Sequence, residues 1–351
     1  MTERPKNIAL SPDGSAVRIV DQTRLPGELV FLDLRGRDEL YEAIRALRVR
    51  GAPALGIFGA YALYVLSLGY GEGDFLSRLD GDASYLVSSR PTAVNLERQI
   101  ERVRALAHRR AGAPAGVLRA ALLREADAIR AEDAAMCRAI AEHGLSLLHE
   151  GDTVLTHCNA GPLATSEYGT GLGPLLLAAE RGTVLRAYVD ETRPLLQGAR
   201  LTAWELQNAG IDVTLIADSM AALAMKEGRI QAVLAGCDRM AANGDAANKI
   251  GTLGAAIAAK RYGVPVYILL PSSTIDLRCP DGAAIPIEQR DPDELRSLWY
   301  ERPMAPAGVR CWNPAFDVTD HDLITAVVTE KGVVYPPFDI HLKELFGGEC
   351  T

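Results

Sequence analysis

The sequence predicts an α/β protein in which a parallel sheet domain follows a smaller, mainly helical domain with a short antiparallel sheet. Its 351 residues exceed the roughly 250–300 at which one hydrophobic core stops growing, so two domains are expected. The first half carries apolar residues at helical spacing, whereas the second half carries short β-rich runs separated by helix-length segments. We place the two domains at residues 1–130 and 131–351.

The N-terminal half begins with extended runs and continues with helices. The runs are Asn7–Leu10, Ala16–Gln22 and Glu28–Leu32. Turns separate these runs, which is typical of a small antiparallel meander. From residue 38 to about residue 150 the apolar residues recur at helical intervals. The stretch 51–71 has no charged residue, but its glycines and proline leave a helix of only Ala54–Leu68. Because this is too short to span a bilayer, we expect a buried helix.

The C-terminal half contains five apolar runs that predict strands. They are Thr153–His157, Val184–Asp190, Asp212–Ile216, Ala232–Gly236 and Val264–Leu270. Runs about 20–30 residues apart are typical of βαβ units and of a parallel sheet. Ligands bind beyond the carboxyl ends of such strands, so the residues that follow each run are the candidates. Residues 169–173 resemble a nucleotide-binding loop. They lie inside a helix-length segment and not at its start, so no dinucleotide site is expected.

Composition excludes several classes of function. The chain has 37 Lys and Arg against 45 Asp and Glu, a net charge of −8, so we expect neither a nucleic-acid surface nor a membrane surface. The six cysteines are far apart, which favours a reducing, cytoplasmic compartment. No residues are spaced like metal ligands, so no metal and no other cofactor is expected. The N-terminus lacks the apolar segment of a secretion signal.

Two strand ends carry side chains suited to acid–base chemistry. Cys158 enters a glycine-containing turn before an expected helix, whose dipoles would favour the thiolate; a small buried thiol is the alternative. Asp238 follows an apolar strand, where withdrawal from water would make it a general acid or base; a pair with Arg239 is the alternative. His157 points to the opposite side of its strand from Cys158, so we expect a hydrogen-bonded core or interface histidine and not a catalytic partner.

Candidate anion-binding residues lie in both halves. Asn248 and Lys249 are expected to begin a helix whose N-terminus binds a phosphate, unless the lysine is merely solvated. The polar turn after the second strand either offers Gln197 and backbone N–H groups to a ligand or caps the next helix with paired charges. Arg50 and Arg90 each precede a helix. Each alone is more often a surface arginine, but two directed at one anion would explain their positions.

Six segments carry a family resemblance: RVRGAPALGI (48–57), RPTAVNL (90–96), THCNAGPLAT (156–165), DETRPLLQGARLTAWEL (190–206), GCDRMAANGDAANKIGT (236–252) and PSSTIDLRCPDGAAIPIEQRDP (271–292). In this order they resemble the S-methyl-5-thioribose-1-phosphate isomerases, aldose–ketose isomerases of methionine salvage. The resemblance implies a Rossmann-like C-terminal domain, a homodimer and a sugar-phosphate substrate. It also implies that Cys158 and Asp238 are the catalytic pair. The implied substrate-binding residues are Arg50, Gly51, Ala52, Arg90, Gln197, Asn248 and Lys249.

The chain departs from this family's usual pattern at three places. Cys237 stands where alanine is common, Ser166-Glu167 where a small residue and glycine are usual, and Tyr335 where arginine is common. The carboxylate at Glu167 leaves the substrate preference open. Related isomerases act on 5-deoxyribose 1-phosphate or on ribose 1,5-bisphosphate, and the second phosphate of the latter would need cations that the sequence does not identify. The regulatory subunits of translation-initiation factor 2B resemble the same fold, but they are expected to lack the cysteine–aspartate pair.

Overall fold

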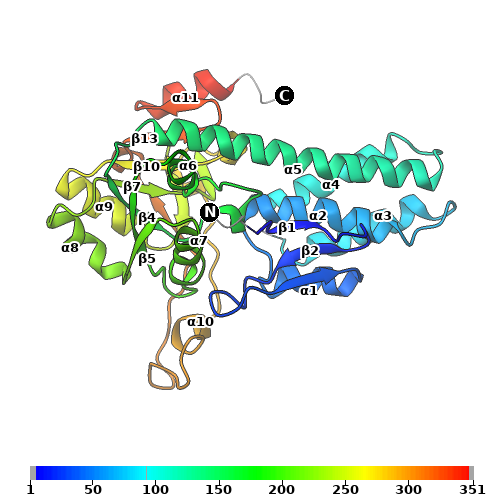
Figure 1. Ribbon diagram of the computed structural model, residues 1–351, viewed down its shortest axis with the longest axis horizontal. Helices are drawn as coiled ribbons and strands as arrows, with labels where there is room; N and C mark the ends of the chain where they lie inside the picture. Colours follow the sequence, from blue (N-terminus) through cyan, green and yellow to red (C-terminus); the bar gives the residue numbers. More distant parts are fainter. Residues whose placement is uncertain (1–4, 92, 348–351) are drawn as a thin grey trace. The chain divides into compact units, whose positions relative to one another are not determined.

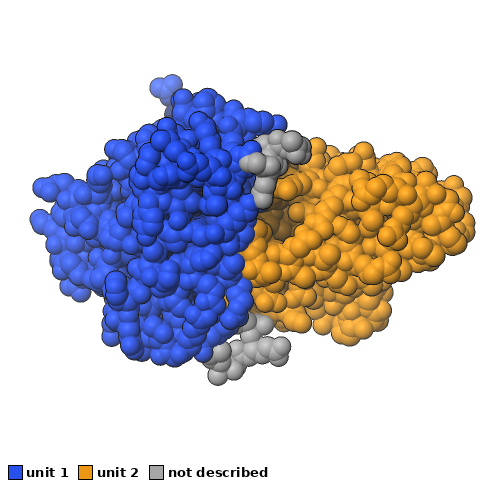
Figure 2. Space-filling model, turned by 90° about the horizontal axis from the view of Figure 1, so that it is seen from above, with its two compact units in different colours: residues 1–2, 138–160, 170–351 blue, residues 3–137, 161–169 orange. Residues whose placement is uncertain are grey.

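The structure is a computed structural model that describes residues 5–91 and 93–347, and it divides into two units (Figure 2). The N-terminal unit comprises residues 5–137 and 161–169, and the C-terminal unit comprises residues 138–160 and 170–347. The division falls inside helix α5 (Ala115–Leu145), seven residues after the expected position at 130. Residues 161–169 also belong to the N-terminal unit, although they follow residues of the C-terminal unit in the chain. The predicted division into two continuous stretches does not include this return.

The N-terminal unit combines a three-stranded antiparallel sheet with helices. The predicted meander is confirmed as β1 (Ile8–Leu10), β2 (Val17–Val20) and β3 (Phe31–Leu34), paired in that order. The third strand begins at Phe31, three residues later than expected. The first part of α5 and four more helices follow: α1 (Arg37–Arg45), α2 (Ala52–Ser67), α3 (Phe75–Ser88) and α4 (Val94–His108). Helices therefore dominate this unit, as the helical spacing predicted.

Helix α2 is the buried helix that the uncharged stretch predicted. Every residue from Ala54 to Leu63 is buried, in the core of the unit. Two glycines allow α4 to pack closely against it. A Cβ on Gly56 would lie 2.8 Å from Gln99 Cγ, and a Cβ on Gly59 would lie 2.8 Å from a Leu96 methyl. None of the helices in the described part of the chain has the length and apolar character to cross a membrane.

The C-terminal unit is built on a seven-stranded sheet with the order β14-β13-β10-β7-β4-β5-β6. All five predicted strands are present: β4 (Thr153–His157), β5 (Arg186–Asp190), β6 (Asp212–Ile216), β7 (Ala232–Ala235) and β10 (Val266–Leu269). These five and β13 (Ala326–Thr329) run parallel, whereas the edge strand β14 (Gly332–Val334) is antiparallel to β13. Helix α11 (Phe338–Phe346) follows β14. The predicted α/β class is therefore confirmed.

Helices cover both faces of this sheet (Figure 1). Helices α6 (Gly173–Arg181) and α7 (Ala203–Asn208) lie on one side of the strands, and α8 (Ala221–Lys226) and α9 (Thr252–Tyr262) lie on the other. The chain runs outward from β4 to β5 and β6, then crosses to β7 on the other side of β4 and continues to β10 and β13. The strand order thus reverses between β4 and β7. In open α/β sheets, ligands bind at the carboxyl ends of the strands at such a switch point.

A second, four-stranded sheet was not predicted. Its order is β11-β8-β9-β12, formed by β8 (Arg239–Ala241), β9 (Ala246–Lys249), β11 (Ile275–Asp276) and β12 (Phe316–Thr319). It corrects the prediction that Asn248 and Lys249 begin a helix, because both residues lie in β9 and α9 begins only at Thr252. A strand of two to four residues gives too few positions for a periodic signal.

The glycine-containing run at 169–173 was placed wrongly from the sequence. Helix α6 begins at Gly173, the last residue of the run, so the run leads into a helix and does not lie in the middle of one. The glycines there serve close packing. A Cβ on Gly171 would lie 3.2 Å from the Gly236 backbone nitrogen, and one on Gly173 would lie 2.9 Å from the Ala141 Cβ.

Candidate active site at the strand switch point

The two predicted catalytic residues leave the sheet from neighbouring strands. Cys158 directly follows β4, and Asp238 lies three residues beyond the end of β7. His157 at the end of β4 is in register with Ala235 at the end of β7. Because the strand order reverses between these two strands, both residues lie at the carboxyl edge of the sheet where a ligand is expected.

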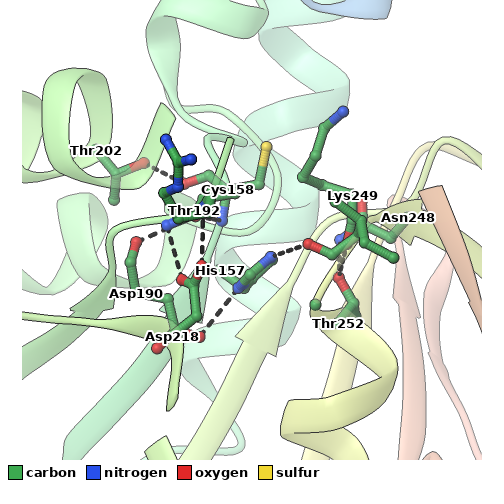
Figure 3. A network of polar contacts seen from close by, with 12 residues as sticks. His157, Cys158, Asp190, Thr192, Thr202, Asp218, Asn248, Lys249 and Thr252 are labelled. Carbon is green, nitrogen blue, oxygen red and sulfur yellow. Dashed lines mark hydrogen bonds and ion pairs between the residues drawn. The ribbon is translucent and has the colours of Figure 1, made fainter. Parts of the chain in front are cut away.

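The backbone of Cys158 is tightly held. Its φ of 65° lies in the left-handed region, which costs a residue other than glycine about 1–3 kcal/mol. The Cys158 N–H donates to Thr192 Oγ1 at 2.9 Å, and its carbonyl oxygen accepts from Thr202 Oγ1 at 2.6 Å. In Figure 3 the sulfur points away from the His157 ring, as the alternation along β4 predicted. The neighbouring hydroxyls therefore hold the backbone from which the half-buried thiol extends.

Asn159 extends this support. Its Nδ2 donates to Thr202 Oγ1 at 3.0 Å and to Glu205 Oε2 at 2.5 Å, and all three side chains are buried. The sequence did not reveal this network, although all three residues lie within the segments that carry the family resemblance. One expectation is wrong: no α-helix starts beside Cys158, since α6 begins only at Gly173. The expected effect of an α-helix directly after the Cys158 turn is therefore absent, and the two threonine hydroxyls hold the Cys158 backbone instead.

His157 is the buried, hydrogen-bonded histidine that the sequence predicted. Its Nδ1 lies 3.0 Å from Asp190 Oδ2, and its Nε2 lies 2.8 Å from the Ile250 carbonyl oxygen. Burial disfavours the charged ring, but the hydrogen bond and charge of Asp190 outweigh this effect and raise the pKa of His157. Burial also raises the pKa of Asp190, because it disfavours the charged carboxylate. Since the pKa of both side chains is raised, the His157–Asp190 pair holds a proton firmly.

Asp218, which sequence reasoning missed, organises the turn that carries Gln197. Its carboxylate accepts the Thr192 N–H at 2.7 Å and the Arg193 N–H at 2.8 Å. These backbone N–H groups are therefore bound within the protein and are not offered to a ligand. Gln197 is buried, and its Oε1 has no hydrogen-bond partner among the described residues. Such an amide oxygen is suited to accept a ligand hydroxyl. An acidic residue just beyond a strand end was the signal that could have identified Asp218.

His157, Asp190 and Asp218 also form a group at metal-ligand spacing. One ligand atom from each lies within 4.8 Å of the others. The expectation that no such group exists is therefore wrong within the described residues. The hydrogen bonds already given account for this arrangement, because His157 Nδ1 faces Asp190 and both Asp218 oxygens accept backbone N–H groups.

Asn248 and Lys249 are both anchored within the C-terminal unit. Lys249 Nζ donates to the Ala315 carbonyl at 2.8 Å and lies 4.6 Å from the centre of the Phe316 ring. The alternative of a merely solvated lysine is therefore wrong. Asn248 is buried, and its Nδ2 donates to Thr252 Oγ1 at 2.9 Å. These contacts position both side chains beside the β9–α9 connection (Figure 3).

The N-terminus of α9 already binds an anion of the protein itself. The N–H groups of Gly251 and Leu253 donate to the two oxygens of the Asp317 carboxylate at 2.7 and 3.2 Å. Helix N-termini attract negative charge, and here Asp317 supplies it. The prediction that backbone N–H groups at this helix end bind a phosphate is therefore wrong, because Asp317 already occupies them. The Lys249 ammonium remains a local cation.

The Asp238 end of β7 is more open. Asp238 is exposed, and its N–H donates to the Ala247 carbonyl at 2.9 Å. The prediction that the Asp238 carboxyl is withdrawn from water is therefore wrong. Arg239, the partner that the alternative gave to Asp238, forms an ion pair with Asp276 at 2.5 Å. The neighbouring Cys237 is the group whose thiol is buried: burial, together with the Asp238 carboxylate, raises its pKa.

Four predicted substrate-binding residues belong to the N-terminal unit. Gly51 precedes α2 with a φ of 92°, and a Cβ there would lie 2.4 Å from Ala164 Cα, so only glycine fits. Ala52 is the first residue of α2, whose first N–H groups have no acceptor within the helix. Arg50 precedes this helix end, and Arg90 lies between α3 and α4; both are half-buried. Arg50 thus stands at a helix end suited to an anion.

Comparisons with known proteins agree with the fold. The profile of the Initiation factor 2 subunit family matches residues 48–336. The methylthioribose-1-phosphate isomerase of Symbiobacterium thermophilum is 54% identical over 349 residues, which cover 99% of this chain and 97% of that protein. The 5-deoxyribose 1-phosphate isomerase of Moorella thermoacetica is 53% identical over 336 residues, 95% of each chain. The crystal structure of 5-methylthioribose 1-phosphate isomerase from Pyrococcus horikoshii matches with a TM-score of 0.93 at 37% identity, and the match covers 99% of this chain and 97% of that one. The chain therefore belongs to the Initiation factor 2 subunit family.

Proposed function

We propose that this chain is an aldose–ketose isomerase that converts S-methyl-5-thio-D-ribose 1-phosphate to S-methyl-5-thio-D-ribulose 1-phosphate, a step of methionine salvage. Relatives named as isomerases of sugar 1-phosphates, at 54% and 53% identity over nearly the whole chain, support this function. The observation that carries it is the presence of Cys158 and Asp238 at the ends of β4 and β7, between which the strand order reverses.

The chemistry of the substrate explains why two acid–base groups are needed. A phosphate on the anomeric oxygen prevents the spontaneous ring opening that other aldoses undergo, so the enzyme must open the ring. Asp238 acts as a general acid and protonates the ring oxygen as the bond between this oxygen and C1 breaks, which leaves an oxocarbenium ion at C1. Cys158 then removes the proton from C2, and the electrons of that C–H bond form a C1–C2 double bond, which gives an enediol-type intermediate. The thiol returns a proton to C1 while the C2 hydroxyl gives its proton back to the Asp238 carboxylate, so that C2 becomes a ketone and the phosphate stays on a CH₂ group. Each acid–base group of this kind contributes about 10²–10⁴ in rate.

The remaining predicted residues bind the substrate in this proposal. The buried Gln197 amide oxygen is unpartnered among the described residues, which supports a hydrogen bond to a sugar hydroxyl. Two arginines and a lysine supply the positive charge for one phosphate in an otherwise acidic protein. The substrate-binding residues are Arg50, Gly51, Ala52, Arg90, Gln197, Asn248 and Lys249.

A direct hydride shift from C2 to C1 is the alternative to proton transfer. The two routes differ in the source of the hydrogen that arrives at C1. Turnover in deuterated water places solvent deuterium at C1 if Cys158 exchanges the proton it removes, whereas a hydride shift places none there. NMR of the product therefore separates the two routes.

The substituent at C5 decides between related substrates. Relatives of almost equal identity carry the names of a methylthioribose and a 5-deoxyribose 1-phosphate isomerase, so both substrates are candidates. Glu167, the departure that left this preference open, is exposed. Ribose 1,5-bisphosphate needs further cations at C5. The family also bears the name of initiation factor subunits, so a non-catalytic regulatory subunit is the second candidate.

The test is to measure kcat/KM of the purified protein on the three sugar phosphates. The proposal expects the highest value for S-methyl-5-thioribose 1-phosphate or for 5-deoxyribose 1-phosphate. Turnover of none of the three by a folded protein would favour the regulatory subunit. We also propose a cytoplasmic homodimer, on the basis of the isomerase resemblance and the scattered cysteines; sedimentation equilibrium tests the dimer, and fractionation of the source cells tests the compartment.

A further inference from the structure

His157 is a buried titratable group that the proposed mechanism does not use. It is 1% exposed, and its ring joins three segments of the C-terminal unit. The residue itself ends β4 and is followed by Cys158. Its Nδ1 faces Asp190 at the end of β5, and its Nε2 faces the carbonyl of Ile250, which directly follows Lys249. The ring thus connects the strand end that carries the proposed base with the segment that carries two proposed substrate-binding residues (Figure 3).

The partners of the ring determine its protons. A carbonyl oxygen only accepts hydrogen bonds, so the contact with Ile250 requires a hydrogen on Nε2. The contact between Nδ1 and Asp190 Oδ2 requires a second hydrogen between these two atoms. The His157–Asp190 pair therefore holds one proton more than a neutral imidazole beside a carboxylate. Without that proton, two lone pairs would face each other 3.0 Å apart in a buried place.

Charges on the surrounding elements favour this extra proton. Asp190 contacts the ring from β5, Asp218 acts on it from the segment after β6, and Asp317 acts on it from β12. Burial opposes a charged ring, but one positive charge among three carboxyl groups is compensated. The pair titrates as one unit, so the proton belongs to the pair and not to either residue alone.

The segment after Ile250 is shaped to fit the ring. Gly251 has a φ of 109°, and a Cβ there would lie 2.6 Å from His157 Cε1. The next residues begin α9, where Asp317 binds the N–H groups of Gly251 and Leu253. The β9–α9 connection is therefore held on one side by the histidine and on the other by Asp317.

We propose that His157 is a positioning residue for the isomerisation: its doubly protonated ring, held by Asp190, fixes the Ile250 carbonyl and so aligns Asn248 and Lys249 with Cys158. This inference rests on the proposed function. Loss of the shared proton at high pH breaks the contact between Nδ1 and Asp190 and loosens the β9–α9 connection. In Asp190→Asn the amide donates to a neutral Nδ1, so the contact persists without the proton.

The first test observes the protons directly, without activity. The chain has only six histidines, so NMR with ring-¹⁵N histidine resolves each of them, and His157→Gln identifies the His157 signals. We expect both His157 ring nitrogens to be protonated in the wild type at neutral pH, and only Nε2 in Asp190→Asn. A singly protonated His157 in the wild type overturns the proposal. A shift of the His157 signals on adding one equivalent of zinc chloride also overturns it, because Nδ1 would then be free to bind a metal.

The second test uses kcat/KM of the folded variants on the substrate that the wild type turns over. We expect His157→Ala to lower kcat/KM about 10–100-fold, the range found where a residue that orients a metal ligand is removed. His157→Gln keeps a donor for Ile250 and should recover most of this loss. His108→Gln is the matched control, because it removes a histidine from an exposed contact with Asp80 in the N-terminal unit and should leave kcat/KM unchanged.

The pH profile separates positioning from a merely structural role. The wild type should lose kcat/KM at high pH through a step that is absent from Asp190→Asn. Identical alkaline limbs in both proteins, or wild-type kcat/KM in folded His157→Ala, overturn the proposal. A wild type that turns over none of the sugar phosphates refutes the proposed function instead, and the NMR result still decides the protonation of His157.

Discussion

The two ends of the proposed acid–base pair are built differently. At the end of β4, Cys158 has both backbone groups bound to threonine hydroxyls and a buried, fully hydrogen-bonded histidine behind it. At the end of β7, Asp238 is exposed at the start of a small second sheet. Preorganisation therefore lies on the Cys158 side.

The largest effect is expected from a substitution that disturbs the rigid side. A Cβ on Gly198 would lie 1.7 Å from the Asp190 carbonyl oxygen and 2.8 Å from Thr192 Oγ1. Gly198→Ala must therefore displace backbone and should lower the free energy of unfolding by about 3 kcal/mol or more. Denaturant titration measures the change. Gly254→Ala is the control, because Gly254 lies in α9 with open space around it. This substitution should raise the free energy of unfolding by about 0.5–1 kcal/mol. Equal stability of the two variants would contradict this picture of the Cys158 side.

A smaller effect is expected from removing one hydroxyl beside Cys158. Thr202→Val leaves the Cys158 carbonyl and the Asn159 amide each without one buried partner, which costs about 1–3 kcal/mol. Turnover should fall about tenfold or more, because the strand end that carries the thiol loosens. Thr202→Ser keeps the hydroxyl and should retain turnover. If the valine and serine variants have the same kcat, the hydroxyl does not orient Cys158.

The pH dependence of stability tests the same side without substrate. The raised pKa of His157 means that its contribution to stability is present in full below about 6.5, its unfolded value, and is lost as pH rises through the folded value. The wild type should therefore lose stability above neutral pH relative to Asp190→Asn. Denaturant titrations of both proteins between pH 6 and 10 measure this difference, and parallel curves would contradict it.

The smallest effect is expected on the Asp238 side. Arg239 binds Asp276, but the arginine side chain is 40% exposed, so Asp276→Asn should cost less than about 1 kcal/mol. The Arg239 hydrogen bond lowers the pKa of Asp276, so this small contribution is present above about 3.9 and is lost as pH falls through the folded value. Thermal unfolding at pH 7 and at pH 3 checks both statements. A loss as large as that of Gly198→Ala would mean that the two ends are equally rigid.

The main sheet could be predicted because its strands are apolar and continuous. The bounds of β4 and β6, two runs of five residues, match the prediction. The second sheet could not be predicted. Its strands β9 and β12 pair residues that are far apart in the sequence, such as Lys249 with Phe316, and neither strand exceeds four residues. Local spacing carries no information on such a pairing.

The candidate site shows the same limit. Cys158, Asp238 and Gln197 could be singled out because each follows a recognisable strand. The contact of His157 with Asp190 spans 33 positions, and that of Gly251 with Asp317 spans 66, so the partners were not predictable. The second contact also explains the error about Asn248 and Lys249. An aspartate from a distant strand caps α9, and the chain before this cap is free to form β9.

Turnover and substrate binding by Cys158→Ser and Asp238→Asn test the central claim most directly. The measurement combines kcat with calorimetric binding of the substrate that the wild type turns over best. If the thiol and the carboxyl act on one substrate, each variant should lose about 10²–10⁴ in kcat and keep nearly the wild-type dissociation constant. Wild-type kcat in either variant would contradict the claim.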